Sequence, residues 1–144
     1  MHRRRVVVTG IGALTPIGNT KNAFWGGLLS GTSGAAPITY FDASMFKTQF
    51  ACEIKNFDAR EHFDRKEARK MDRFTQYAMV ASDEAVNDAG LELEKIDKSR
   101  VGVIWGSGVG GLETFQNEVL NFADGNGTPR FNPFFIPKMI ADIA

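Results

Sequence analysis

Twice along this chain, a short apolar run passes directly into a glycine-rich turn and then into a helical pattern. The two runs are Val6–Val8 and Val101–Trp105. Apolar runs without polar alternation are typical of strands that are buried on both faces of a sheet. Because such strands occur in folds that alternate strands with helices, the pattern predicts the α/β class.

Apolar periodicity and capping residues predict the remaining elements. Thr20 offers an N-cap and Gly31 a stop for the first helix, and Gly90 lies where a helix C-terminus favours glycine. Alternation of apolar and polar residues predicts a half-exposed strand at Phe50–Ile54. The predicted helices cover residues 21–30, 72–89 and 112–122, and a fourth begins near Pro137.

The last residues, Lys138–Ala144, continue in good helix formers and reach neither a capping glycine nor a polar tail. A helix of two turns is not stable alone. We therefore expect the chain to be a fragment of a longer protein.

Composition argues against several functional classes. The 144 residues hold 17 Lys and Arg against 17 Asp and Glu, and this zero net charge disfavours nucleic-acid binding. No apolar run reaches the roughly 18 residues of a membrane-spanning helix. Arg3–Arg5 precede an apolar stretch without the cleavage site of a secretory signal, so we expect a cytoplasmic protein. Cys52, His2 and His62 are too few for a disulfide framework or a metal cluster.

Two glycine-rich turns are similar to cofactor-binding loops. Gly106–Gly111 fits the G-x-G-x-x-G pattern, but the helix after it leads into a Gly/Asn/Pro loop around Asp124 instead of a second strand. Gly10–Gly18 lacks the Gly-Lys-Ser/Thr ending of a phosphate-binding loop. We expect both turns to let a backbone pass close to a neighbour, and we expect no nicotinamide binding.

A basic segment, Arg65–Arg73, interrupts the neutral sequence. At about 100° per residue, a helix would gather Lys66, Arg69, Lys70 and Arg73 within an arc of about 100°, with the acidic residues of the segment outside it. Such a stripe attracts an acidic partner and speeds its encounter. The alternative interpretation is an ordinary solvated helix face.

No complete catalytic constellation is present in the sequence. Cys52 has Glu53 beside it, which opposes thiolate formation, so a small packed residue is the expected role. His62 belongs to no recognisable catalytic spacing.

Several segments together resemble the N-terminal part of the β-ketoacyl-acyl-carrier-protein synthases, nearest to the type II elongation enzymes. They appear in the family's order and span nearly the whole chain, at Arg4–Asn19, Arg65–Asp72, Gly106–Gly111 and Asn132–Pro137. The resemblance implies that residues 1–144 are the N-terminal portion of a layered thiolase-like α/β/α/β/α domain, incomplete in this chain.

The resemblance also implies an activity. These enzymes take an acyl group from carrier protein onto a cysteine, decarboxylate malonyl-carrier protein and join the two groups. It implies a homodimer, acyl carrier protein as partner, and no cofactor beyond the phosphopantetheine of that carrier. The family's catalytic cysteine and histidines match no residue here, so we expect no catalytic residue in this chain and no activity from it alone.

The resemblance assigns roles to individual residues. Lys66, Arg69 and Lys70 match carrier-protein docking positions, and Gly108 and Val109 match the lining of the acyl pocket. Phe134 and Phe135 resemble the segment that forms the pocket floor across the dimer interface, with ordinary aromatic core as their alternative. Two other readings stay open: a polyketide ketosynthase or chain-length factor, and a noncatalytic module that binds an acidic carrier protein.

Overall fold

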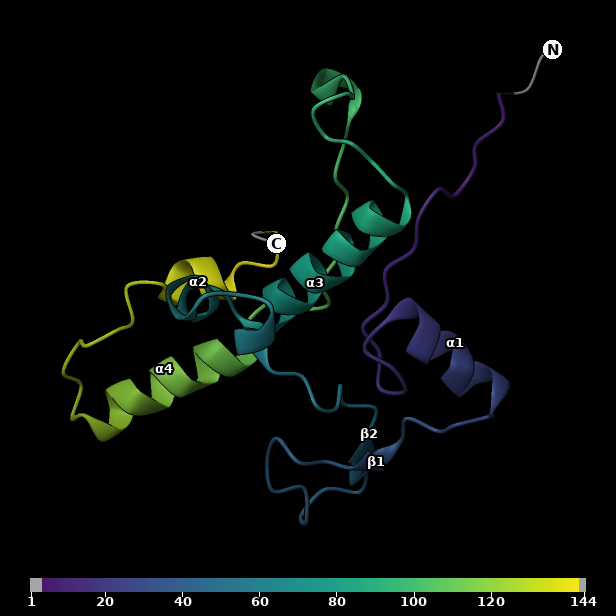
Figure 1. Ribbon diagram of the computed structural model, residues 1–144. Coiled ribbons are helices and arrows are strands. Elements are labelled where there is room, and N and C mark those ends of the chain that lie inside the picture. Colours follow the sequence, from purple (N-terminus) through teal and green to yellow (C-terminus); the bar gives the residue numbers. More distant parts are fainter. Residues whose placement is uncertain (1–3, 143–144) are drawn as a thin grey trace. The chain divides into compact units, whose positions relative to one another are not determined.

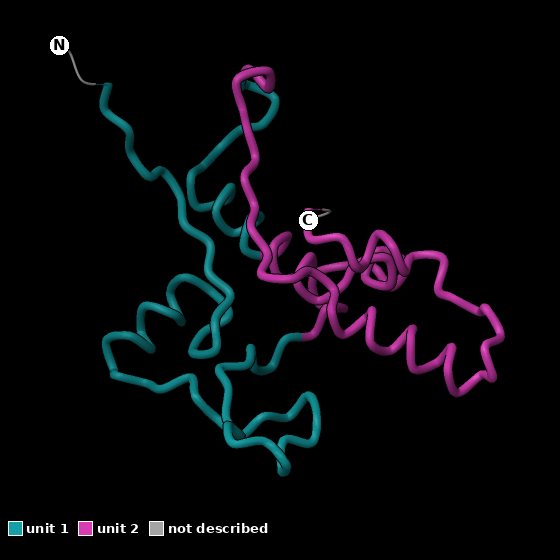
Figure 2. Tube along the Cα trace, turned by 180° about the vertical axis from the view of Figure 1, so that it is seen from behind, with its two compact units in different colours: residues 1–57, 81–96 teal, residues 58–80, 97–144 magenta. Residues whose placement is uncertain are grey.

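The computed structural model describes residues 4–142, which form two compact units (Figures 1 and 2). One unit contains the residues up to 57 together with 81–96, and the other contains 58–80 together with the residues from 97 onward. The helices are α1 (Lys21–Leu29), α2 (Arg65–Lys70), α3 (Arg73–Asp88), α4 (Leu112–Asp124) and α5 (Phe135–Met139); the strands are β1 (Ala36–Pro37) and β2 (Phe50–Ala51). No helix among the described residues is long and apolar enough to span a membrane.

In the first unit, α1 begins and ends where the capping residues predict. The Thr20 hydroxyl accepts a hydrogen bond from the Ala23 amide at 3.2 Å. Gly31 follows the helix with φ +67°, a conformation that favours glycine. The strands β1 and β2 pair antiparallel, with Ala36 opposite Ala51, so the strand predicted at Phe50–Ile54 is confirmed for its first two residues only.

The first glycine-rich turn lies against the second half of α3. A Cβ atom at Gly10 or Gly12 would overlap a carbonyl oxygen of that helix, at Ala85 and Ala81 respectively. This close backbone approach is the role expected for the turn, and the predicted helix at 72–89 is confirmed as α3.

In the second unit, α4 packs against α5 through aromatic rings. Phe135 stacks on Phe115 and Phe131, with ring centroids 6.2 and 5.8 Å apart, and Phe131 stacks in turn on Phe122 at 5.5 Å. Stacked aromatic pairs contribute about 0.5–1.5 kcal/mol each beyond area burial. The α4 helix confirms the prediction at 112–122 and ends, as expected, at the glycine-rich Gly125–Pro129 segment.

The predictions of buried strands at Val6–Val8 and Val101–Trp105 are wrong for this structure. Both segments are extended but unpaired in the described part of the chain, and Val6 is 93% and Ile104 100% exposed. A strand buried on both faces needs hydrogen-bonded neighbours at its edges and covering layers on its faces. Neither is present among residues 4–142, so the apolar side chains stay accessible.

The prediction of one helix from Pro137 to the end of the chain also needs correction. The α5 helix begins earlier, at Phe135, and Pro137 lies in its first turn, where amides have no intrahelical partner. It ends at Met139 because Ile140 is extended (ψ 128°) and the Met139 carbonyl accepts the Gly111 amide at 3.1 Å. Residues 143 and 144 lie outside the described part.

Candidate functional site

The basic segment folds into α2, a helix of only six residues. Asp64 is its N-cap, and its Oδ1 accepts hydrogen bonds from the amides of Lys66 (2.7 Å) and Glu67 (2.9 Å). The helix ends at Lys70, since Met71 is extended (ψ 142°). Isolated helices of this length are unstable, so the contacts at both ends of α2 decide whether it forms.

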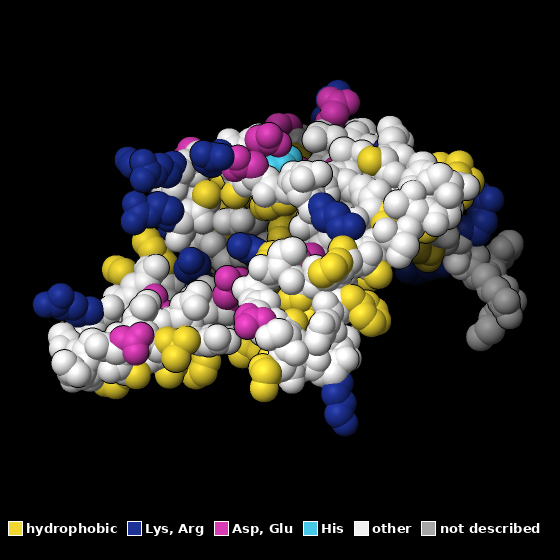
Figure 3. Space-filling model, turned by 90° about the horizontal axis from the view of Figure 1, so that it is seen from below, with side chains coloured by type: hydrophobic (Ala, Val, Ile, Leu, Met, Phe, Trp, Pro, Cys, Tyr) yellow, Lys and Arg dark blue, Asp and Glu magenta, His cyan; other side chains and the backbone are white. Residues whose placement is uncertain are grey.

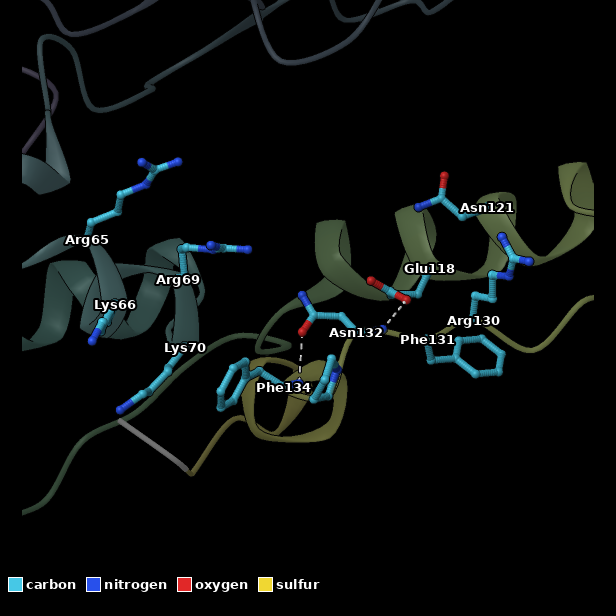
Figure 4. Close-up of a pocket in the computed structure, with 11 residues that line it drawn as sticks. Arg65, Lys66, Arg69, Lys70, Glu118, Asn121, Arg130, Phe131, Asn132 and Phe134 are labelled. Atoms are coloured by element: carbon cyan, nitrogen blue, oxygen red, sulfur yellow. Dashed lines mark hydrogen bonds between the residues drawn. The ribbon is translucent and has the colours of Figure 1, made fainter.

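A groove of about 930 Å³ runs along α2 (Figure 4). One wall consists of the α2 cations, and the opposite wall comes from α4 and the segment that leads into α5. The first wall contains Arg65, Lys66, Arg69 and Lys70; the second contains Glu118, Asn121 and residues 130–134.

The groove is strongly cationic. Five Lys or Arg side chains line it against one carboxylate, that of Glu118. The Glu118 Oε2 atom accepts the Asn132 amide at 3.0 Å, so its charge is directed at the backbone of the second wall. Figure 3 shows Lys and Arg side chains gathered at the left edge of the face in view, next to hydrophobic ones. The mixture of cationic and apolar side chains along the groove suits an acidic partner with some apolar surface.

The α2 cations lie in two rows. Arg65 and Arg69 are four residues apart and point the same way, toward the wall that α4 forms (Figure 4). Lys66 and Lys70 form the second row, and the Lys70 ammonium pairs with Glu67 at 2.6 Å on the exposed side of the helix. Such an exposed pair contributes little and leaves Lys70 able to change partners.

The structure brings the three predicted docking residues together but excludes the fourth cation of the predicted stripe. Lys66, Arg69 and Lys70 all line the groove. Arg73 lies instead at the start of α3, because the helix breaks at Met71 and the rotation of about 100° per residue does not continue through it.

Sequence reasoning missed two cations of the groove, Arg65 and Arg130. The spacing of four residues between Arg65 and Arg69 is a signal that could have found the first. Arg130 follows a glycine-rich loop sixty residues later, and only the tertiary structure brings it to α2.

The four residues predicted to line an acyl pocket occupy different surroundings. Phe134 lines the cationic groove, whereas Phe135 belongs to the aromatic stack of α4 and α5. Gly108 and Val109 lie in an open loop, where Val109 is 68% exposed and a Cβ atom at Gly108 would meet no atom within 4 Å. The acyl-pocket role stays a prediction.

Several amides of the two glycine-rich turns have partners within the chain. In the first turn, the Ile11 amide donates to Asp88 (2.9 Å) and the Ala13 amide to Glu84 (2.8 Å). In the second, Gly111 donates to the Met139 carbonyl. A dinucleotide phosphate needs such amides free. The described geometry therefore favours the packing role expected for these turns.

Cys52 is not the packed residue predicted from the alternating pattern. Its side chain is exposed and forms no disulfide, because β2 ends at Ala51 and Cys52 lies beyond the paired residues. Among residues 4–142, no three His, Cys, Asp or Glu side chains are grouped so that they could hold a metal ion.

Comparison with known proteins gives consistent relatives. Residues 3–144 match the family described as "Beta-ketoacyl synthase, N-terminal domain". The chain is 46% identical over its whole length to "3-oxoacyl-[acyl-carrier-protein] synthase 2" of Synechocystis sp.. It is 48% identical over 98% of its length to the protein of that name from Staphylococcus aureus (strain COL). The chain spans about a third (34%) of each relative.

Two solved structures are similar in fold. The ishigamide ketosynthase/chain length factor superposes with a TM-score of 0.75, at 28% identity, over 96% of this chain and 34% of that one. A type II PKS acyl-carrier protein in complex with its ketosynthase gives a TM-score of 0.72, also at 28% identity, over 96% of this chain and 35% of that one.

Proposed function

Because this chain belongs to the family of β-ketoacyl synthase N-terminal domains, we propose that it is the carrier-docking portion of a 3-oxoacyl-acyl-carrier-protein synthase II. The fold class is the predicted thiolase-like α/β type, of which the chain covers a part. In the reaction proposed for the whole protein, an enzyme cysteine takes the acyl group from its carrier. That transfer releases the carrier's own thiol. Decarboxylation of malonyl-carrier protein then gives CO2 and an enolate, which attacks the acyl-enzyme thioester. The products are a 3-oxoacyl-carrier protein and the freed enzyme cysteine.

The cationic groove beside α2 carries the docking part of this proposal. Acyl carrier protein is the partner that the proposed activity requires, and one similar structure is a ketosynthase in complex with such a protein. A surface with five cations and one carboxylate raises the local concentration of an acidic protein and orients it on arrival. We assign Lys66, Arg69 and Lys70 to this contact, with Arg65 beside them.

Sequence identity supports the fatty-acid elongation function more strongly than the polyketide function. The relatives named synthase 2 share 46–48% identity with the chain, whereas the polyketide ketosynthase structures share 28%. A full-length protein that carries this chain should convert acyl- and malonyl-carrier protein into one 3-oxoacyl product lengthened by two carbons.

The products of that assay separate the candidate functions. Poly-β-keto products would favour a polyketide ketosynthase, and carrier binding without any condensation would favour the noncatalytic module. The isolated chain should bind carrier protein but form no product, and measurable condensation by it would contradict the assignment of catalysis to residues beyond this sequence.

Three further properties belong to the same proposal. The substrate is held on the carrier's phosphopantetheine and no other cofactor takes part. The whole protein is a homodimer, as the family resemblance implies. The same proposal places the protein in the cytoplasm. Light scattering on the full-length protein tests the dimer, and a monomeric mass at micromolar concentration would contradict it.

A further inference from the structure

The cations of α2 can act as one docking surface only if this short helix is held in place. Six residues provide too few internal hydrogen bonds to offset the cost of helix nucleation. The carbonyl groups of the last turn also need donors from outside the helix. Asp64 fixes the beginning of α2, and the end of the helix needs a separate contact.

The end of α2 is held by a side chain of the next helix. Gln76 lies in the first turns of α3 and is 9% exposed. Its Nε2 group donates a hydrogen bond to the Ala68 carbonyl of α2 at 3.0 Å and approaches the Met71 carbonyl at 3.5 Å. The Gln76 side-chain amide spans the break between the helices and pairs with the Ala68 carbonyl, one of those that α2 leaves free.

The surroundings give the Gln76 backbone a fixed position. The backbone N–H of Gln76 donates a hydrogen bond to the Asp72 carbonyl at 3.1 Å. The neighbouring Thr75 and Ala78 are buried, with 5% and 3% of their surface exposed. A buried amide side chain costs free energy unless its polar atoms are paired, and an apolar side chain of similar length would avoid that cost. The amide at this position is therefore best explained by the carbonyl groups that it reaches.

We propose that Gln76 is a positioning residue for carrier-protein docking: its side-chain amide fixes α2 against α3 and so sets where Lys66, Arg69 and Lys70 stand. This inference rests on the docking function proposed above. Gln76 does not line the groove and reaches the partner only through α2.

The test uses the full-length synthase with two kinds of substrate. Gln76→Met keeps the length and burial of the side chain but removes the donor. With carrier-bound substrates, KM should rise about five- to tenfold, as for the loss of a helix cap. With acyl and malonyl thioesters of a small thiol, which need no docking surface, kcat/KM should stay within about twofold of the wild type. In Gln76→Glu an oxygen replaces the donor. This variant should likewise raise KM for the carrier-bound substrates and leave kcat/KM for the small thioesters nearly unchanged.

A double-mutant cycle identifies the route of the effect. If Gln76 acts through the α2 cations, Gln76→Met should cost much less in an Arg69→Ala background than in the wild type. Fully additive effects would overturn the inference, as would equal losses with both kinds of substrate or no loss with carrier-bound substrate. Failure of both Gln76 variants to fold would overturn it too, because Gln76 would then serve the whole fold.

The single variant Arg69→Ala separates this inference from the docking proposal. If Arg69→Ala leaves the KM for carrier-bound substrate unchanged, the docking function itself fails. If it raises that KM while the Gln76 variants do not, only the role of Gln76 fails.

Discussion

Asp64 is the residue on which the first turn of α2 depends. Its carboxylate accepts the amides of Glu67 and Lys66, and these hydrogen bonds, together with the nearby charge of Lys70, hold the pKa of Asp64 below its usual value of 3.8. A carboxylate whose pKa is depressed by folding stabilises the fold above its unfolded pKa. That stabilisation is lost as the pH falls through the lower folded value.

We therefore predict that acidification uncaps α2 only when residue 64 is ionisable. In the wild type, the amide proton shifts of Lys66 and Glu67 should titrate with the Asp64 carboxylate, whose pKa lies below its usual value. In Asp64→Asn they should not, because a neutral amide oxygen still accepts the hydrogen bonds. Asp64→Ala should show uncapped shifts at every pH. Identical titrations in the wild type and Asp64→Asn would contradict the cap.

Gly12 offers a second test at the scale of one residue. A Cβ atom there would overlap the Ala81 carbonyl oxygen, so Gly12→Ala must push the turn away from α3 and break hydrogen bonds such as that of Ala13 to Glu84. We expect a loss of about 1–3 kcal/mol in unfolding free energy, as for other overpacked sites.

The matched control for Gly12 is Gly26 in α1. A Cβ atom at Gly26 would meet nothing within 4 Å, so Gly26→Ala should be neutral or slightly stabilising because alanine favours the helix. Thermal denaturation of both variants measures the difference. Equal melting temperatures would show that the turn does not need glycine for close approach.

At the scale of elements, the sequence predicts helices much better than strands. The boundaries of α1, α3 and α4 follow from residues within the helix or next to it, such as Thr20 and Gly31. The apolar runs Val6–Val8 and Val101–Trp105 carry a strand pattern, but pairing depends on partners far along the chain, and no local signal supplies those.

The break between α2 and α3 is another feature that local sequence signals do not predict. Helix-forming residues run through the segment, and Met71 carries no proline or glycine signal. The carbonyls near the break are instead satisfied by the buried Gln76 side chain, a contact eight residues from Ala68. Arg73 therefore belongs to α3, as the predicted helix at 72–89 requires, and not to the stripe that a continuous helix would form.

The loop that carries Gly108 and Val109 allows a test of the acyl-pocket prediction. Val109 belongs to no helix or strand of the structure, and the variant Val109→Phe adds a larger side chain at this position. In the full-length enzyme the larger ring should shorten the usable pocket and lower kcat/KM for the longest acyl-carrier substrates by roughly tenfold, with short substrates unaffected. An unchanged chain-length preference would contradict a pocket role for Val109.

At the scale of the whole molecule, zero net charge hides an uneven distribution. Acidic and basic residues balance at 17 each, yet five cations and a single carboxylate line one groove. Three of the five cations could be predicted, because Lys66, Arg69 and Lys70 lie close in sequence. Arg130 and Phe134 could not, since the second wall depends on how α4 and α5 pack through the stack that includes Phe135.

Binding of acyl carrier protein to the full-length enzyme, measured at several salt concentrations, tests the docking claim most directly. The combined change of Lys66→Glu and Arg69→Glu should weaken binding at least tenfold at low salt, about 1.4 kcal/mol or more. The difference should shrink as salt screens the charges. Lys47→Glu, an exposed reversal that does not line the groove, should have little effect. Equal affinities for the double variant, the Lys47 control and the wild type would contradict the proposal that acyl carrier protein docks on this groove.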